Sequence, residues 1–435
     1  MANTATQISN SLYNQFAEIN LATGTDDLSS LRKKTFEQFK ILGFPSTKVE
    51  DWKYTPLTNF LKGEFEITNG NNISIDSSII SNAKIPGLDC YSIVLVNGQY
   101  RADLSDKISN NKIVIASIKD AANSETFRSH FGKYIRTETN HFAALNTALF
   151  IDGLFIEIKR NVIADKSLHI IHITTTGKDS FLQPRHLFVL DANSESDIIE
   201  SYITVDNTGV AFVNDVSEIV INDNAKLNHY YIQTGNEKTR YIQQTQVYQQ
   251  SSSLYNNFKA SFQDISLLRA NLNVVLDGTN IESHLYGLYF AGGHQLIDNH
   301  TIVDHRQPNC LSNELYKGVM KDEAVGIFNG KIFVRKLAQK TNAFQQNNNL
   351  MLSKKATINS KPQLEIFADD VKCSHGSTVG QFDDEALFYL KSRGIGDEKA
   401  RSLLVQAFIF DVTDKFNIPE VQSHINHLIE SGLNA

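Results

Sequence analysis

Residues 185–207 read RHLFVLDANSESDIIESYITVDN, and the pattern in this stretch decides the fold. Two runs rich in β-branched and apolar residues, RHLFVL and SDIIESYIT, flank the short polar segment DANSE. Runs of this kind, bounded by Asn, Asp and Ser, are typical of short β-strands. The stretch therefore predicts two successive strands joined by a tight polar turn.

The same texture extends over residues 151–378. It recurs in the runs GLFIEIKR, SLHIIHITTTG, KLNHYYIQTGN, RYIQQTQVYQQ, LNVVLDGTN and SHLYGLYFAGG. Long helical patterns are missing between these runs, which argues against alternating strands and helices. A long series of short strands with polar turns predicts a sandwich, a barrel or a β-helix.

Two observations favour the β-helix. The strand pattern continues over more than 200 residues, which is more than one sandwich needs. Asparagine recurs near strand ends, in LVNG, FVND, INDN and LDGTN, where left-handed backbone and side-chain ladders are useful. No fixed repeat length is visible, so periodicity alone does not settle the choice.

Both flanks have a helical pattern. In residues 1–150, ISNSLYNQFAEINL and LSSLRKKTFEQFKILG have apolar residues at helical spacing, and YSIVLVNG and KIVIAS read as short strands. In residues 379–435, FDDEALFYLKSRG has acidic residues first, basic residues last, and then Gly394. Asp397 is the expected N-cap of the next helix, whose apolar stripe is predicted to comprise Ala400, Leu403, Leu404, Ala407 and Phe408. PEVQSHINHLIES predicts a last helix with Val421, Ile425, Leu428 and Ile429 on one side.

The composition limits the classes of protein to which the chain can belong. The 435 residues are 41% hydrophobic and 20% charged with a net charge of −7, which is typical of a globular protein and not of a nucleic-acid or membrane-surface binder. The N-terminus has no signal-peptide pattern, and no window has the roughly 18 apolar residues of a membrane span. The three cysteines, Cys90, Cys310 and Cys373, are far apart, which fits a reducing cytoplasm.

Cys373 and His375 lie two residues apart in ADDVKCSHGSTVGQ. If this segment is a strand, both side chains point to one face and could reach one metal ion, since thiolate and imidazole are both metal ligands. In a helix the same spacing would separate them. The plainer interpretation, a buried thiol beside a histidine bonded to backbone, is the more common situation for a free cysteine.

A second cluster lies in HQLIDNHTIVDHRQPNC, with His294, His300, His305 and Cys310, near Asp304 and the upstream His284. The spacings fit no compact metal motif, and polar surface of the β-helix is the favoured interpretation. GIFNGKIF is one residue short of a phosphate loop, and neither GxSxG nor HExxH occurs, so no catalytic motif is apparent.

The segment ADDVKCSHGSTVGQFDDEALFYLKSRGI resembles the SufB/SufD family of iron–sulfur cluster assembly proteins. PSTKVEDWKYTPL, the long run from NELYKGVMKDEAVGIF to this segment, and KSRGI…KARSLL resemble other parts of the family, so most of the chain is covered. The CSHG sequence and the few cysteines favour the SufD branch. The resemblance implies a mainly β fold: a right-handed parallel β-helix, here residues 151–378, flanked by helical domains at residues 1–150 and 379–435.

The resemblance also implies a role. The chain would be a non-enzymatic scaffold that pairs through its β-helix with a SufB-like subunit. A SufC-like ABC-type ATPase would bind the C-terminal helices, where we expect Arg393, Gly394, Arg401, Leu404 and Phe408 to take part. His375, with Cys373, would contribute to a transient iron–sulfur cluster shared with the partner subunit. A desulfurase system would supply sulfur, and the sequence leaves flavin binding open.

The residue chemistry agrees with this role. A cluster takes about four protein ligands, mostly thiolates, and one Cys–His pair is too few for this chain to hold a cluster alone. The missing phosphate loop means that ATP-driven motion must come from a partner. Three alternatives remain: a homodimeric scaffold of the same family, a carbohydrate-active β-helix enzyme, and a metalloenzyme built on His294, His300 and His305.

Overall fold

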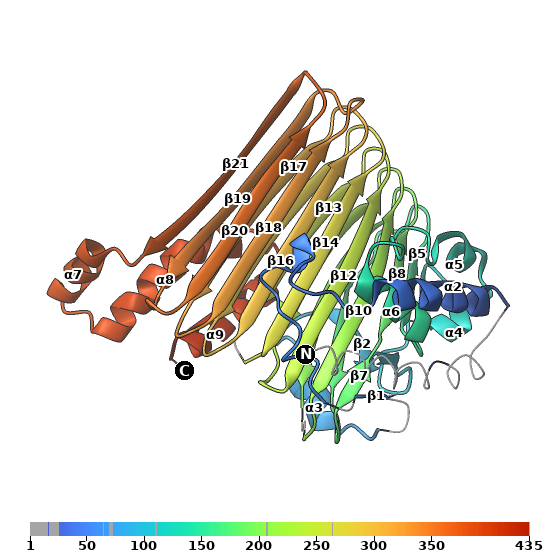
Figure 1. Ribbon diagram of the computed structural model, residues 1–435, viewed down its shortest axis with the longest axis horizontal. Helices are drawn as coiled ribbons and strands as arrows, with labels where there is room; N and C mark the ends of the chain where they lie inside the picture. Colours follow the sequence, from blue (N-terminus) through green and yellow to red (C-terminus); the bar gives the residue numbers. More distant parts are fainter. Residues whose placement is uncertain are drawn as a thin grey trace.

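The strand–turn–strand unit of residues 185–207 is the repeating unit of the whole molecule. β8 (Arg185–Leu190) and β9 (Glu195–Thr204) are successive strands that belong to two different sheets. From β8 to β21 (Val371–Gln381), the last strand, successive strands alternate between these two sheets, and the chain winds as a parallel β-solenoid of about 7 turns (Figure 1). The predicted parallel β-helix with helices at both ends is confirmed. The computed structural model describes residues 16, 26–63, 65–68, 73–108, 111–205, 208–262 and 264–434.

Within those residues, the first sheet has eleven strands and the second has ten. The first sheet contains β20 (Thr357–Ile366), β18 (Val325–Val334), β16 (Leu296–His305), β14 (Leu267–Leu276), β12 (Thr239–Gln249), β10 (Ala211–Ile221), β8, β5 (Leu154–Ile158) and β4 (Ile113–Ser117), with β7 (Ser180–Leu182) and β1 (Glu66–Ile67) beside them. The second contains β21 (Val371–Gln381), β19 (Thr341–Met351), β17 (Leu311–Met320), β15 (Glu282–Ala291), β13 (Leu254–Ser261), β11 (Lys226–Gln233), β9, β6 (Ser167–Thr174), β2 (Cys90–Val96) and β3 (Gln99–Tyr100).

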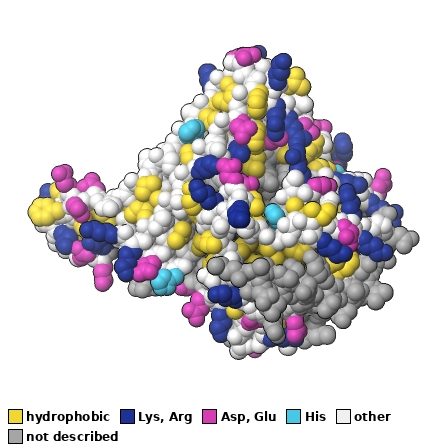
Figure 2. Space-filling model, viewed as in Figure 1, with side chains coloured by type: hydrophobic (Ala, Val, Ile, Leu, Met, Phe, Trp, Pro, Cys, Tyr) yellow, Lys and Arg dark blue, Asp and Glu magenta, His cyan; other side chains and the backbone are white. Residues whose placement is uncertain are grey.

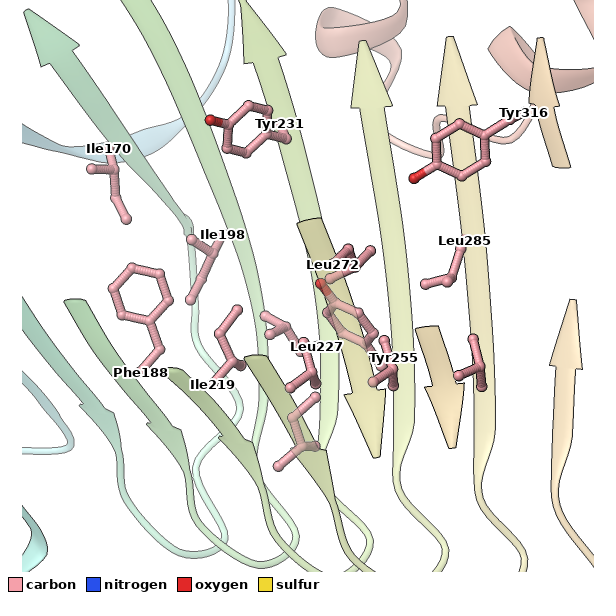
Figure 3. Packing of buried hydrophobic residues seen from close by; sticks show 14 of the residues in the cluster. Ile170, Phe188, Ile198, Ile219, Leu227, Tyr231, Tyr255, Leu272, Leu285 and Tyr316 are labelled. Carbon is pink, nitrogen blue, oxygen red and sulfur yellow. The ribbon is translucent and has the colours of Figure 1, made fainter. Parts of the chain in front are cut away.

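The register explains why no fixed repeat is visible in the sequence. Leu254 pairs with Glu282, which is 28 residues further on, whereas Val325 pairs with Thr357, which is 32 residues further on. The strands stay aligned because the turns absorb the difference in length. Every second residue of each strand faces the interior, where the two sheets pack against each other. Figure 3 shows such inward side chains, among them Ile198, Leu227 and Tyr255 from one sheet and Phe188, Ile219 and Leu272 from the other.

The turns between first-sheet and second-sheet strands form a ladder. Asn193, Asn224, Asn280 and Asn309 all have φ near +60°, which is the left-handed conformation that Asn tolerates better than most residues. The amide of Asn193 donates to the carbonyl of Asp223 in the next turn at 2.9 Å, and the Asn224 side chain donates to that of Asn193 at 3.2 Å. The predicted use of asparagine for left-handed turns and side-chain ladders is confirmed.

The N-terminal helices cover the outer face of the first sheet. They are α2 (Asp26–Leu42), η1 (Glu50–Trp52), α4 (Ile118–Ala121), α5 (Glu125–His130) and α6 (His141–Leu149), while α3 (Ser77–Ala83) packs by β2. The Arg269 guanidinium lies 3.8 Å from the centre of the Trp52 ring and donates to Asp298 at 2.6 Å, which anchors the EDWKY segment to the sheet. The helix predicted for ISNSLYNQFAEINL lies outside the described residues, apart from Phe16.

Two C-terminal helices, α8 (Asp397–Thr413) and α9 (Pro419–Asn434), cover the outer face of the second sheet, and α7 (Asp384–Ser392) precedes them. Val405, Ile409 and Val412 of α8 pack with α9 against Tyr230, Phe258 and Leu288 of the sheet, and α7 projects away from the solenoid (Figure 1). Among the described residues, no helix is both long enough and apolar enough to span a bilayer.

Two details of α8 differ from the sequence prediction. Its buried residues are Ala400, Val405, Ile409, Val412 and Thr413, so the apolar stripe is rotated from the predicted one. Its N-cap is Gly396 and not Asp397. The Asp397 carboxylate instead accepts hydrogen bonds from Lys391 and Arg401, both at 2.7 Å, and these bonds compete with capping.

Candidate functional site

The solenoid is open at its last turn. β21 pairs only with β19, and β20 pairs only with β18, so in the described chain each of the two strands is the edge of its sheet (Figure 1). Most residues of β21 are exposed, and Ile366, Phe367 and Val379 are exposed apolar residues at this end. Exposed edges with apolar side chains are templates for contact with another chain.

Cys373 and His375 lie on the inward face of this last strand. Ala343 of β19 is fully buried in the core and pairs with Cys373, and Gln345 pairs with His375. Cys373 packs against the same core, and His375, two residues on in the strand, shares its face. The segment is a strand, so the two side chains lie on one face, which is what a shared metal site requires. His375 is exposed because no further turn of the described chain covers it.

The Cys373 side chain is half-buried, and burial raises the pKa of its thiol. Such a sulfur carries its proton at neutral pH and is a poor ligand until a metal or a positive charge lowers that pKa. Cys90 lies in β2 and Cys310 follows β16, and neither belongs to the last turn. Over the described chain, the open end therefore offers a single thiol and a single imidazole.

Polar side chains fill the interior behind this strand. The Gln345 amide donates to the Glu314 carboxylate at 2.7 Å, and Ser360 donates to Asn347 at 2.8 Å. Ser377 of β21 donates to Ser360 of β20 at 2.8 Å, which links the two edge strands across the interior. Sequence reasoning missed these residues. The available signal was the run TNAFQQNNNL, in which the alternate positions 345, 347 and 349 are Gln, Asn and Asn.

A second polar cluster is sealed inside the first turns. Glu200 accepts hydrogen bonds from His172 at 2.8 Å and His229 at 2.7 Å, and Tyr202 donates to Asp215 at 2.9 Å. Burial opposes ionisation of Glu200, but the bonds from the two histidines outweigh burial and hold its pKa well below the ordinary value. Burial raises the pKa of Asp215 to about 7.

Three members of this cluster, His172, His186 and Asp215, present ligand atoms within 4.8 Å of one another. The hydrogen bonds of His186 count against a metal site. Its Nδ1 accepts the Leu154 amide at 3.1 Å, so the neutral ring carries its proton on Nε2 and has no free lone pair there. Burial lowers the pKa of His186 to about 3, so the ring is neutral. The cluster is best described as a buried hydrogen-bond network.

The other predicted histidine cluster is dispersed. His300 faces outward and lies 2.9 Å from Asp298, whereas His305 faces inward and bonds Ser312 at 2.8 Å. His294 is exposed in a turn, and the Cys310 thiol donates to the Gly278 carbonyl at 3.2 Å. These side chains do not converge. The interpretation as polar surface holds for His294, but His305 and Cys310 are buried in the interior.

The residues expected to contact an ATPase lie around α7 and α8. Arg393 ends α7 and covers the Tyr389 ring at 5.2 Å, Gly394 has φ +85°, and Arg401 covers the Phe382 ring at 5.1 Å. Leu404 is half-buried, and so is Phe408, whose ring lies under Lys317. Sequence reasoning missed the most exposed apolar residues of these helices, Phe388, Tyr389 and Phe410, at 74%, 57% and 58% exposure. Figure 2 shows hydrophobic side chains at the projecting α7 end.

Comparisons with known proteins place this architecture. Residues 172–408 match the model of the SufBD core domain of the SUF system for FeS cluster assembly, and residues 3–170 match the SufBD N-terminal region. An iron–sulfur cluster assembly SufBD family protein of Synechocystis sp. is 30% identical over 94% of this chain and 92% of its own length. The iron–sulfur cluster assembly protein SufD of Escherichia coli is 30% identical over 87% of this chain and 86% of its own length. SufD of Bacillus subtilis is 26% identical over 93% of each chain. The chain therefore belongs to the SufBD family of iron–sulfur cluster assembly proteins, as a SufD-like member.

Proposed function

We propose that this protein is a non-catalytic scaffold subunit whose open solenoid end pairs with a SufB-like subunit. His375, with Cys373, stands beside the cluster that grows between the two chains. The observation that carries this proposal is the position of His375: it faces inward on the last strand, yet it is exposed because no further turn of the described residues covers it. A ligand in that position is completed only by another chain.

The shortage of ligands supports a shared site. A cluster takes about four protein ligands, mostly cysteine thiolates. In the described last turn, Cys373 is the single thiol, and burial keeps it protonated. A partner that brings further thiolates completes the ligand set, and an incomplete set on each chain favours release of the cluster.

The C-terminal helices are the proposed docking surface of a SufC-like ATPase. Phe388, Tyr389 and Phe410 expose large apolar surfaces on helices whose other faces pack on the solenoid or on each other. Arg393 lies over the Tyr389 ring, and Gly394, Arg401, Leu404 and Phe408 lie in α8 or in the turn that leads to it. Large apolar side chains that are exposed mark contact sites in soluble proteins.

The test is co-expression with SufB-like and SufC-like subunits, followed by affinity purification and anaerobic cluster assembly. We expect the three chains to co-purify in both the wild type and His375→Ala, and cluster formation to fall in the variant. Lys372→Ala is the matched control because Lys372 is exposed on the opposite face of the same strand.

Three outcomes contradict parts of this proposal. Normal cluster formation by His375→Ala removes the role of His375. Failure of the chains to co-purify removes the heteromeric scaffold, and a stable dimer of this chain alone, by light scattering, replaces it with a homodimer. Bound flavin is read from the absorption spectrum of the purified complex.

A further inference from the structure

Gln345 lies directly behind His375 in one column of inward-facing residues. The register pairs Glu314 of β17 with Gln345 of β19, and Gln345 with His375 of β21. Neighbouring strands are about 4.8 Å apart, so the Gln345 amide and the imidazole are adjacent along the column. Glu314 is 2% exposed and Gln345 is 3% exposed, whereas His375 is open to solvent.

The hydrogen bonds of Gln345 orient its amide. Nε2 donates to the Glu314 carboxylate at 2.7 Å, and this bond fixes which end of the amide is the oxygen. The oxygen, Oε1, is buried and has no hydrogen-bond partner in the described chain. A buried acceptor without a donor is destabilising, so an unused acceptor next to a histidine calls for an explanation.

The facing sheet leaves space for this amide. Gly330 of β18 has no side chain, and a Cβ at that position would lie 2.3 Å from Nε2 of Gln345. Its φ is not in the left-handed region, so backbone conformation does not require glycine there. The close approach of the Gln345 amide is what requires it. Glu314 and Gly330 together hold the amide in one place.

The structure shows no hydrogen bond between His375 and the Gln345 amide oxygen. We propose that Gln345 is a positioning residue for His375: when the exposed imidazole turns toward the column, the Gln345 amide oxygen accepts the N–H of one ring nitrogen and leaves the other nitrogen free for iron. Metal-binding histidines commonly donate their second N–H to a carbonyl or carboxylate, which fixes the tautomer and raises the basicity of the ligating nitrogen. Glu314 acts on His375 indirectly, because it holds the Gln345 amide in place. This inference rests on the proposed function of His375, but its first test does not.

The first test measures the tautomer of His375 in the isolated chain by NMR on ¹⁵N-histidine-labelled protein, with His375→Ala for assignment. We expect one dominant tautomer in the wild type and a mixture of both in Gln345→Leu. Gln345→Glu keeps an acceptor and restores the single tautomer. Gln346→Leu is the matched control, since Gln346 is the exposed, outward-facing neighbour. The same tautomer ratio in the wild type and Gln345→Leu overturns the proposal.

Gly330→Ala is a second variant that leaves Gln345 itself unchanged. The added methyl displaces the amide, so the tautomer ratio should shift part of the way toward that of Gln345→Leu. This variant decides the question if Gln345→Leu does not fold, and an unshifted ratio in a folded Gly330→Ala contradicts the proposal.

The second test measures ferrous iron binding by the co-purified complex. Loss of such an outer partner lowers metal affinity by about 10–100-fold, and we expect this loss in Gln345→Leu but not in Gln346→Leu. If His375→Ala leaves iron binding unchanged while the tautomer still depends on Gln345, the proposed function fails and the positioning contact stands. If His375→Ala abolishes binding and the tautomer is independent of Gln345, only the positioning role fails.

Discussion

The two ends of the solenoid contain the same kinds of side chains under opposite conditions. At the first end, His172 and His229 are sealed inside and bonded to Glu200, beneath a layer of helices. At the last end, His375 also faces inward, but it is exposed and makes no side-chain hydrogen bond within the described chain. The comparison teaches that coverage, and not residue type, separates a stabilising histidine from one available to a ligand.

Removing an acceptor at the closed end should have the largest effect on stability. Glu200→Ala leaves His172 and His229 without their buried acceptor, and breaking such a buried pair costs about 3–5 kcal/mol. His375→Ala should change stability by less than about 0.5 kcal/mol because the side chain is exposed. Urea unfolding of the two variants checks this, and equal losses would contradict the comparison.

The outer faces give a second comparison, between neighbours on α8. Ile409 is 3% exposed and packs on the second sheet, so Ile409→Ala should destabilise the protein by about 2–5 kcal/mol. Phe410 is 58% exposed, so Phe410→Ala should leave thermal stability unchanged and weaken ATPase binding in the co-purification. If ATPase binding is unchanged in both variants, the proposed docking surface is contradicted.

Glu314 predicts a pH dependence near the open end. Burial raises the pKa of Glu314 to about 7, above the ordinary value of 4.5, and its neighbours Thr301 and Gln345 are uncharged. The unfolded chain ionises first as pH rises, so this group lowers stability from about pH 4.5 to 7. At about 1.4 kcal/mol per pKa unit, the effect is up to about 3 kcal/mol.

Glu314→Gln should therefore lose less stability than the wild type between pH 5 and 7.5, measured by urea unfolding across that range. Glu323→Gln, at an exposed turn, is the control and should follow the wild type. Parallel curves for the wild type and Glu314→Gln would show that Glu314 is ionised in the folded protein.

The smallest expected effect concerns the turn ladder. Asn224 takes the left-handed position in an early turn, whereas Lys340 takes it at φ +57° in the turn between β18 and β19. A left-handed residue other than Gly or Asn costs about 1–2 kcal/mol. Lys340→Gly should therefore raise the midpoint of thermal unfolding, by an amount reduced by the greater freedom of glycine in the unfolded chain. Asn224→Ala should lower the midpoint.

Much of the fold could be predicted from the sequence because local rules agree with the global structure. The Asn-rich turns and strand-like runs predict a solenoid, and Val421, Ile425 and Ile429 are buried along the predicted stripe of the last helix. Cys373 and His375 do lie in a strand, as expected, but PQLEIFADDVKC is not the single alternating strand that the sequence predicts: it contains the end of β20, a turn at residues 367–370, and the start of β21.

The interior contacts were not predictable. Turns of unequal length shift the register, from 28 residues between Leu254 and Glu282 to 32 between Val325 and Thr357, so the sequence does not reveal which residues stack. Gln345 behind His375 follows only from that register. The stripe of α8 was placed on the wrong face because Leu403 and Leu404 are apolar but half-buried, and periodicity does not say which apolar face meets the sheet.

Hydrogen–deuterium exchange of this chain, alone and bound to a SufB-like subunit, tests the central claim most directly. We predict that binding protects the amides of β20 and β21, including residues 371–381, and leaves exchange of the closed-end strands β2 and β6 unchanged. Protection confined to the closed end, or none on β21, would contradict the account.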